Sequence, residues 1–441
     1  MGRVRAAVRA GATVGAAALV MAAGVPGAAR AAGTAPPPAP SYRAADGAKA
    51  VEGKPSTADA PLLEAGSIYK DTLAPGERVY RLVLEKDESN VYVSAVVRPA
   101  PGAKVSSSDG IEVEIMTTAG RSCPAGTGRA SFGYDSAPIG AAGVRWGAED
   151  EDCAPAGVYY AKVTRTSAKA SDQSPWPLEL RVQREPGRGA GVPTTAPSTW
   201  PSGAPSLPGS EAVARTGGTG FNDARALGAG VWRDEMRPGQ TRYYRVPLDW
   251  GQQLGLSAEL AAAKMTKPYG SASGGLTVSL YTPYRSLVSD KDTSYDGKQA
   301  GITLEKTPPV AYENRFSSDR AVQPVSIAGW YYVAVTMGGK VAEFTEDATP
   351  VPLTLRTELS GTPANAPAYK EGLAAGGFGV GAEDRAAARD GLTAPEAADA
   401  AEKGSVMRVV AGAGFGTGTL LLLVLGGWIL LARRGGGATA G

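Results

Sequence analysis

Histidine is the residue whose absence most restricts the chemistry of this sequence. None occurs among the 441 residues. A Ser-His-Asp triad, a Cys-His dyad and a zinc site with an imidazole ligand are therefore excluded. Carboxylate chemistry, Ser-Lys chemistry and calcium binding remain. We predict that the protein is not an enzyme, and calcium is the one cofactor that we consider.

Three aspartates at close spacing are the candidate calcium ligands. Asp290, Asp292 and Asp296 place hard oxygen ligands along a short segment, as calcium loops do. The segment departs from the EF-hand pattern, because Tyr295 stands in place of the obligatory glycine and Gly301 in place of the bidentate carboxylate. A solvated strand connection is the preferred interpretation, and a calcium site is the alternative.

A second acidic cluster comprises Glu149, Asp150, Glu151 and Asp152. Adjacent carboxylates repel one another unless solvent or a cation screens them, so we expect an exposed loop. Either cluster offers two carboxylates for glycoside chemistry, but their separation decides that chemistry, and the sequence does not give it. A surface carbohydrate-binding module or hydrolase that uses these acidic loops is our alternative function.

The two cysteines, Cys123 and Cys153, lie in the same predicted domain. In an exported protein such a pair most often forms a disulfide, and two buried free thiols are the alternative. Such a bridge would close a loop of about 30 residues, for which the chain-entropy model predicts roughly 3–4 kcal/mol of stabilisation.

The beginning of the chain has the pattern of a secretory signal peptide. Residues 1–11 contain arginines and no acid, residues 12–25 are apolar, and Ala29 and Ala31 form an A-x-A cleavage site. Together these features predict a signal peptide over residues 1–31, and an uncleaved anchor helix is the alternative.

The end of the chain has the pattern of a membrane anchor. Residues 409–431 are 23 uncharged residues, enough for a helix to cross a hydrocarbon core of about 30 Å. Arg433 and Arg434 follow. We predict a transmembrane helix over residues 405–432 and a cytoplasmic tail at 433–441, which makes a single-pass type I protein of the cell membrane with an extracytoplasmic ectodomain.

Small residues recur within this predicted helix. Gly412, Gly414, Gly416 and Gly418 form two overlapping small-xxx-small steps. Such steps allow close helix packing, so they favour a transmembrane dimer or a membrane partner, with the glycine-rich composition as the alternative explanation.

Segments rich in Pro, Gly, Ser and Ala divide the ectodomain into two parts, which we call the first and second blocks. The predicted order is a disordered stalk (32–60), a first β-sandwich block (61–185), a linker (186–220), a second β-sandwich block (221–359) and a juxtamembrane linker (360–404). Within the last segment, residues 382–403 favour a polar helix that has no apolar stripe to bury.

The two blocks carry matching motifs in the same order. The matches are 75–84 with 238–248, 110–115 with 275–280, 156–160 with 328–332, and 177–181 with 352–356. The offset grows from 163 residues at Pro75 to 175 residues at Pro177. Collinear matches of this kind predict a duplicated domain, and chance similarity of two β-rich segments is the alternative.

Each matched segment has the pattern of a half-buried strand. Val113 and Ile115 alternate with Glu112 and Glu114, which is the period of two that places one face of a strand on a core. Turn signals separate the segments. The predicted fold class is all-β, with two tandem jelly-roll-like β-sandwiches, a signal peptide and one C-terminal transmembrane helix.

The motif order resembles that of bacterial pre-peptidase C-terminal domains. The second block carries the pattern best, at residues 240–248, 253–258, 276–281 and 329–335. The resemblance implies small jelly-roll β-sandwiches that assist surface binding or folding of secreted enzymes. No catalytic domain accompanies them here, and the Ala/Gly-rich composition is similar to that of envelope proteins from high-GC Gram-positive bacteria.

Charge and aromatic content complete the functional prediction. With 45 basic and 43 acidic residues, the chain gives no electrostatic reason to expect nucleic-acid binding. Aromatic residues concentrate in the second block, where they suit a core or a binding face. We predict a non-enzymatic protein in the bilayer, whose β-sandwiches bind or scaffold a membrane or cell-wall protein.

Overall fold

The computed structural model describes residues 42–84, 89–147, 151–192, 195–197, 199–346, 349–364 and 366–403, without the side chains of 124–126. These residues all belong to one compact unit. Within them, no helix is long and apolar enough to cross a membrane. The predicted signal peptide and transmembrane helix, with Gly412, Gly414, Gly416 and Gly418, lie outside the described residues.

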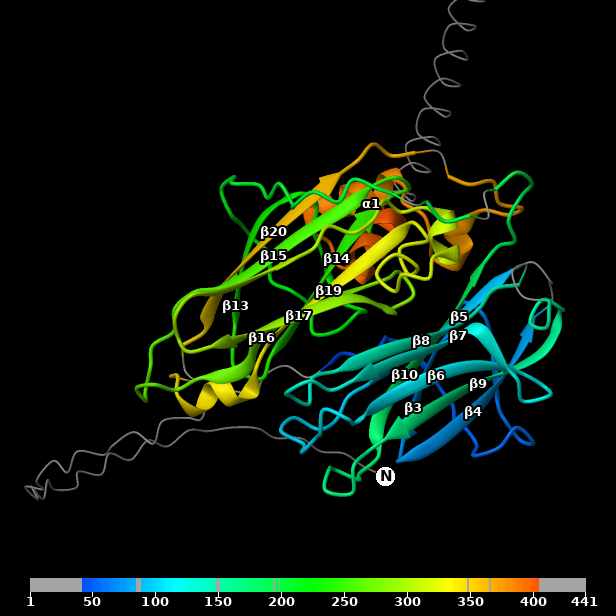
Figure 1. Ribbon diagram of the computed structural model, residues 1–441, viewed down its shortest axis with the longest axis horizontal. Coiled ribbons are helices and arrows are strands. Elements are labelled where there is room, and N and C mark those ends of the chain that lie inside the picture. Colours follow the sequence, from blue (N-terminus) through cyan, green and yellow to red (C-terminus); the bar gives the residue numbers. More distant parts are fainter. Residues whose placement is uncertain are drawn as a thin grey trace, which may run out of the picture. The chain divides into compact units, whose positions relative to one another are not determined.

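The described residues form an all-β fold of four five-stranded sheets (Figure 1). The first block contains two of them. Sheet 1A has the order β1 (Lys49–Ala50), β3 (Ile68–Leu73), β10 (Trp176–Glu185), β5 (Asn90–Val97) and β8 (Ile139–Arg145). Sheet 1B has the order β2 (Leu62–Leu63), β4 (Gly76–Leu84), β9 (Gly157–Thr166), β6 (Gly110–Thr117) and β7 (Ser122–Ser131).

The second block contains the other two sheets. Sheet 2A has the order β11 (Val213–Ala214), β13 (Gly230–Met236), β20 (Val351–Ser360), β15 (Gln253–Leu260) and β18 (Ala300–Leu304). Sheet 2B has the order β12 (Arg225–Ala226), β14 (Thr241–Leu248), β19 (Gly329–Met337), β16 (Ala272–Tyr281) and β17 (Leu287–Tyr295). Three short 3-10 helices accompany them: η1 (Tyr312–Phe316), η2 (Gly339–Glu343) and η3 (Leu373–Gly376).

The strand order of the first block repeats in the second. Every strand of sheets 1A and 1B has a counterpart ten strands later in sheets 2A and 2B, in the same position. In both blocks the two-residue edge strand of each sheet pairs parallel with its neighbour, whereas the longer strands pair antiparallel. This repeat is the structural counterpart of the collinear sequence matches.

Each block is sandwich-like, with a core between its two sheets. Val113 and Ile115 on β6 are fully buried, and Val278 and Leu280 on the matching β16 are buried as well. Their neighbours along the strand point outward, as the period of two predicts. The predicted disulfide is confirmed, because Cys123 and Cys153 are bonded and both side chains lie in the first core.

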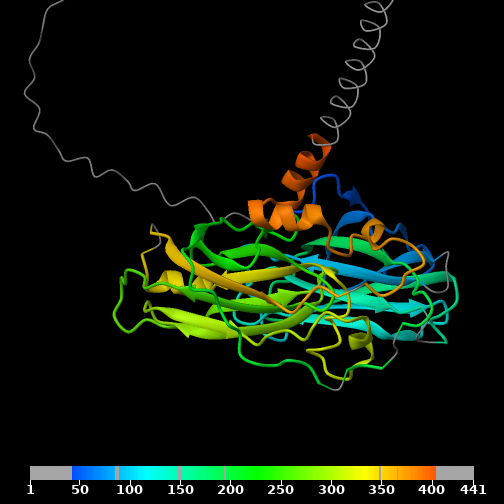
Figure 2. The same cartoon turned by 90° about the horizontal axis from the view of Figure 1, so that it is seen from above.

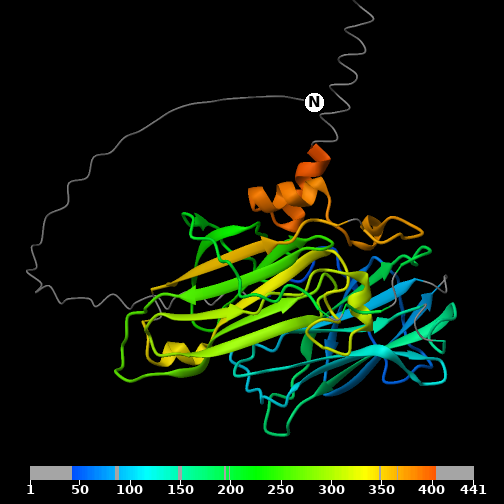
Figure 3. The ribbon, with the colours of Figure 1, turned by 45° about the horizontal axis from the view of Figure 1, so that its top comes forward.

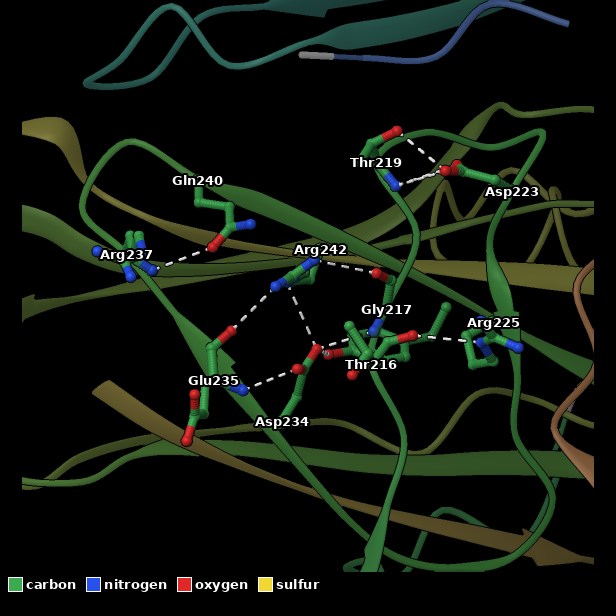
Figure 4. Close-up of polar contacts among 11 residues, drawn as sticks. Thr216, Gly217, Thr219, Asp223, Arg225, Asp234, Glu235, Arg237, Gln240 and Arg242 are labelled. Atoms are coloured by element: carbon green, nitrogen blue, oxygen red, sulfur yellow. Dashed lines mark hydrogen bonds and ion pairs between the residues drawn. The ribbon is translucent and has the colours of Figure 1, made fainter. Parts of the chain in front are cut away.

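One aspartate in each block, buried in the second block and half-buried in the first, fixes the chain segment that enters the block. Asp234 accepts hydrogen bonds from the backbone N–H of Gly217 at 2.8 Å and from the hydroxyl of Tyr244 at 2.7 Å. Figure 4 shows Asp234 between Gly217 and Arg242, whose Nε lies 3.5 Å from Oδ2. Burial and this carboxylate raise the pKa of Tyr244 well above its ordinary value. The contact orders Gly217, inside the predicted linker.

The first block repeats both hydrogen bonds to the aspartate. Asp71 accepts hydrogen bonds from the N–H of Gly53 at 2.8 Å and the hydroxyl of Tyr80 at 2.7 Å. A Cβ on Gly53 would lie 2.6 Å from the Tyr80 ring, and a Cβ on Gly217 would lie 2.8 Å from the Tyr244 ring. Both glycines are therefore required by the close approach of backbone to ring.

The predicted stalk and first linker need correction at their inner ends. β1 and Gly53 lie within residues 32–60, and β11 and Gly217 lie within residues 186–220, yet all belong to the sheets or their buried contacts. Both blocks therefore begin earlier than predicted. Backbone pairing needs no apolar side chain, so the Ala-, Pro- and Gly-rich composition concealed these strands.

The predicted juxtamembrane linker is also structured in its described part. Helix α1 (Ala382–Asp390) ends at Gly391, which has a left-handed φ of 71°, and residues 394–403 are helical again. Ala387 and Ala388 are buried, so small residues supply the packing face where no stripe of large apolar residues exists. Figures 2 and 3 show these orange-red helices against the strands of the second block.

Polar contacts hold α1 on sheet 2B. Three arginines donate hydrogen bonds to carbonyl oxygens at the end of α1 and just beyond it: Arg215 to Arg389 at 2.8 Å, Arg225 to Gly391 at 3.0 Å and Arg245 to Leu392 at 3.1 Å. Trp330 Nε1 donates to Asp384 at 2.8 Å. Cations at a helix C-terminus complement its dipole and its unpaired carbonyls.

Candidate functional site: the cleft between the two blocks

Strand β10 of the first block carries two buried glutamates that contact the second block. Glu185 is fully buried. Its carboxylate accepts hydrogen bonds from Arg315 at 3.0 Å, Tyr369 at 2.7 Å, Asn90 at 2.7 Å and Tyr92 at 2.5 Å. Burial raises the pKa of Glu185, but the charge of Arg315 and these hydrogen bonds outweigh burial and hold that pKa below its ordinary value.

Glu179 forms an ion pair with Arg285 of the second block, as Glu185 does with Arg315. It accepts hydrogen bonds from Arg285 at 2.5 Å, Asn222 at 2.9 Å, Tyr42 at 3.1 Å and the backbone N–H of Ala45 at 2.8 Å. Burial opposes ionisation of Glu179, yet the charge of Arg285 and the hydrogen bonds lower its pKa. The carboxylate is therefore charged and fully satisfied at neutral pH.

Apolar contacts join the blocks beside these ion pairs. Tyr92, Ala142 and Val144 of the first block belong to the same buried cluster as the core of the second block. The Tyr92 and Tyr284 rings stack with centroids 4.3 Å apart. Removing one partner from a buried ion pair leaves a charge without compensation, which costs about 3–5 kcal/mol. The interface therefore fixes the two blocks relative to each other.

The loop between β7 and β8 extends from the first block onto the second. Asp135 accepts a hydrogen bond from the N–H of Gly339 at 3.2 Å, and the ring of Tyr134 contacts Gly274. This loop lines two cavities, one of about 320 Å³ and one of about 340 Å³. Both are lined by Asp135, Ala137, Pro138, Thr241 and Thr336. We call them together the inter-block cleft.

The wall of the cleft that sheet 2B supplies is rich in hydroxyl groups. Thr241, Thr277, Ser279 and Thr336 line it, and the Thr241 and Thr336 hydroxyls lie 2.9 Å apart. These residues point outward because their neighbours on β14, β16 and β19 fill the core. The wall can donate and accept hydrogen bonds at several adjacent positions.

Two carboxylates from the edge strand β17 complete that wall. Asp290 lies opposite Ser279 and Asp292 lies opposite Thr277 in the register of β16 and β17. Both aspartates line the cavity of about 320 Å³. Desolvation raises the pKa of Asp290, and the like charge of Asp292 raises it further. This pair favours a ligand that donates hydrogen bonds to it.

The predicted calcium ligands are not brought together. Asp290 and Asp292 share one face of β17, whereas Asp296 lies in the turn after that strand and accepts a hydrogen bond from the N–H of Lys298 at 3.0 Å. No three acidic or cysteine side chains converge as a metal site in the part of the chain that the structure describes. The segment that suggested a calcium loop is mostly regular strand.

The second acidic cluster lies elsewhere. Asp152 pairs with Arg121, and residues 149 and 150 lie outside the described part. Asp135 and the hydroxyl residues of sheet 2B were not among the residues predicted from the sequence. Outward-pointing Thr and Ser on a strand are common, so only the approach of the β7–β8 loop distinguishes these from ordinary surface residues.

Comparison with known proteins assigns no family. No family model matches the chain, and no curated protein matches it. Among solved structures, the N-terminal CBM22-1–CBM22-2 tandem domain of Xyn10C from Paenibacillus barcinonensis is 14% identical, with 73% of this chain and 100% of that chain covered and a TM-score of 0.18. Infectious bursal disease virus (Gx strain) gives 10% identity, coverages of 68% and 72%, and a TM-score of 0.21. Human MASP-1/3 CUB1-EGF-CUB2 gives 7% identity, coverages of 66% and 99%, and a TM-score of 0.15. We draw no functional conclusion from likenesses this distant.

Proposed function

We propose that this protein is a non-enzymatic, single-pass type I protein of the cell membrane whose ectodomain binds or scaffolds a membrane or cell-wall protein. Its two blocks are then jelly-roll-like domains similar to pre-peptidase C-terminal domains. The observation that carries the proposal is the pair of buried ion pairs, Glu179 with Arg285 and Glu185 with Arg315, between the blocks. They make one rigid surface from two domains.

Rigidity is useful for a scaffold because a preorganised surface loses less entropy when a partner binds. Hinged domains would have to be ordered at that step. The C-terminal segment supports the same role, since α1 is held on sheet 2B by Arg215, Arg225 and Arg245. The ectodomain is thereby fixed to the segment that precedes the predicted transmembrane helix in the sequence.

The membrane topology can be tested directly. In intact cells of the native host, we expect external protease to digest the ectodomain and mass spectrometry to find a mature N-terminus at Ala32. Retention of residues 1–31 together with protection from protease would contradict the proposed topology.

The scaffold role is tested by quantitative co-purification. Full-length protein is cross-linked in its own membranes, solubilised in detergent and compared with a version that lacks residues 409–431 and with an Arg285→Met/Arg315→Met variant. We expect a stoichiometric partner whose recovery falls in the Arg285→Met/Arg315→Met variant, because Glu179 and Glu185 are left buried without their ion-pair partners and the rigid surface is lost. A partner recovered equally from that variant, or none at all, contradicts the proposal.

The alternative, carbohydrate binding, is favoured by a separate observation, the hydroxyl-rich wall of the inter-block cleft. The cleft does not depend on the membrane anchor.

A further inference from the structure

Sheets 1B and 2B have matching positions whose side chains can be compared one by one. Glu112 and Arg129 of sheet 1B form an ion pair at 2.5 Å, and Glu114 and Lys162 form another at 2.6 Å. The register of the strands is the same in both sheets, since Glu112 lies opposite Thr164 as Thr277 lies opposite Thr336. The residues of sheet 2B that correspond to the four charged residues are Thr277, Asp292, Ser279 and Ala334.

The outward face of sheet 1B therefore satisfies its own charges, whereas that of sheet 2B does not. Asp292 has replaced the arginine and Thr277 the glutamate, so the cross-strand partner is gone. Asp290 and Asp292 face the cleft together with the hydroxyls of Thr277 and Ser279. Carboxylates that lack a cross-strand cation and lie beside hydroxyl groups in a concave site suit a ligand-binding surface.

The opposite wall adds an aromatic ring. The Tyr134 side chain is 51% exposed, and Gly274 contacts its ring. An aromatic ring with an open face packs against apolar C–H groups while the polar groups nearby fix the ligand's orientation. The cleft thus combines a ring, hydroxyls and carboxylates, and the β7–β8 loop lines both of its cavities.

We propose that the inter-block cleft binds a neutral, hydroxyl-rich glycan chain of the cell envelope. Sugar hydroxyls both donate and accept, so they match the Thr and Ser hydroxyls as well as the carboxylates of Asp290 and Asp292. A lysine-rich peptide would offer its side-chain charges to the aspartates alone. The inference rests on the proposed function only in placing the ectodomain at the envelope.

The test measures binding of a defined glycan to the full-length protein in detergent. The probe is a preparation of neutral glycan strands, N-acetylglucosamine oligomers that carry no peptide and no carboxylate, titrated by calorimetry. A Thr277→Glu/Asp292→Arg variant installs the ion pair of sheet 1B in the cleft wall. We expect saturable binding by the unchanged protein and at least a tenfold loss of affinity in this variant.

A matched variant controls for general effects on the sandwich. Glu114→Ser/Lys162→Ala removes an ion pair from the same face of sheet 1B, outside the cleft. We expect its affinity for the glycan strands to stay within twofold of the unchanged protein. Thermal unfolding of each variant separates a lost site from a lost fold, and Ser279→Ala is the milder second variant if Thr277→Glu/Asp292→Arg unfolds early.

Three outcomes would overturn the inference. In the first, a folded Thr277→Glu/Asp292→Arg variant binds the glycan with the same affinity as the unchanged protein. In the second, the Glu114→Ser/Lys162→Ala control loses as much affinity as the cleft variant. In the third, the protein binds a lysine-rich peptide in a saturable, salt-sensitive way and does not bind the glycan. Failure of the scaffold proposal is distinguishable, because it is measured by protein co-purification. Glycan binding with no protein partner supports this inference and contradicts that proposal.

Discussion

Sheets 1B and 2B place their strands in the same order and register, yet their outward faces differ in chemistry. Sheet 1B presents paired charges and leaves Val83 and Val158 partly exposed. Sheet 2B is covered by Phe221, by the first block and by α1, and its uncovered part lines the cleft. The inward residues stayed apolar in both sheets.

The difference shows which positions of a repeated fold are free to diverge. Inward residues of both copies must fill a close-packed core, so their size and polarity are restricted. Outward residues affect stability much less, and there one copy has acquired an interface, a docked helix and a candidate site. If the two copies are still equivalent in stability, matched changes in them should have equal effects, and changes at diverged positions should not.

The largest effect is expected from breaking the interface between the copies. Arg315→Met leaves Glu185 buried without its ion-pair partner, so we expect the free energy of unfolding to fall by about 3–5 kcal/mol. Chemical denaturation followed by far-UV circular dichroism measures this. The Arg315→Met/Glu185→Met variant is the control and should recover most of the loss. If Arg315→Met is as stable as the unchanged protein, the ion pair does not hold the blocks together.

The next effect should be confined to one copy. Cys123→Ser/Cys153→Ser removes the bridge of the first block, whose cysteines are 30 residues apart, and the chain-entropy model predicts a loss of about 3–4 kcal/mol. Hydrogen exchange resolved by mass spectrometry should show faster exchange in strands of sheets 1A and 1B first. Equal acceleration in sheets 2A and 2B would show that the blocks unfold only as one unit.

A smaller and equal effect is expected at a position that the copies share. Gly53→Ala and Gly217→Ala each place a Cβ within 3 Å of a buried tyrosine ring, and such overpacking costs about 1–3 kcal/mol. Thermal unfolding of the two single variants measures the cost. Gly203→Ala is the control, since nothing lies near a Cβ at that position. A difference of more than twofold between the first two variants would show that the repeated aspartate contact is not equivalent in the blocks.

The smallest expected effect is a difference in how strongly acid lowers the melting temperature of the unchanged protein and of a variant without the Glu185 ion pair. The folded-state pKa of Glu185 lies below its ordinary value of 4.5. Its pairing therefore stabilises the protein above about pH 4.5, and this stability is lost as the pH falls through the lower folded-state pKa. Melting temperatures measured across the acidic range should fall more steeply for the unchanged protein than for Arg315→Met/Glu185→Met. Parallel curves would contradict this assignment.

Local features of the sequence were sufficient for much of the fold. The alternation of Val113 and Ile115 with Glu112 and Glu114 reports which side of a strand is buried, because successive side chains point to opposite faces. The collinear motifs anticipated the repeated strand order. Two cysteines in a chain with a predicted signal peptide were enough to predict their bond. Each of these inferences needs only the period of a strand or covalent chemistry.

Tertiary contacts decided the rest. Nothing in the sequence singled out Glu179 and Glu185, because their buried partners, Arg285 and Arg315, come from the second block. The predicted polar linker became docked helices because arginines far along the chain receive the end of α1. Asp290 and Asp292 were singled out in the sequence as candidate calcium ligands, but the residues that surround them in the cleft were not singled out. Which groups face them depends on how a loop of one block meets a sheet of the other, and contacts at that separation leave no local period in the sequence.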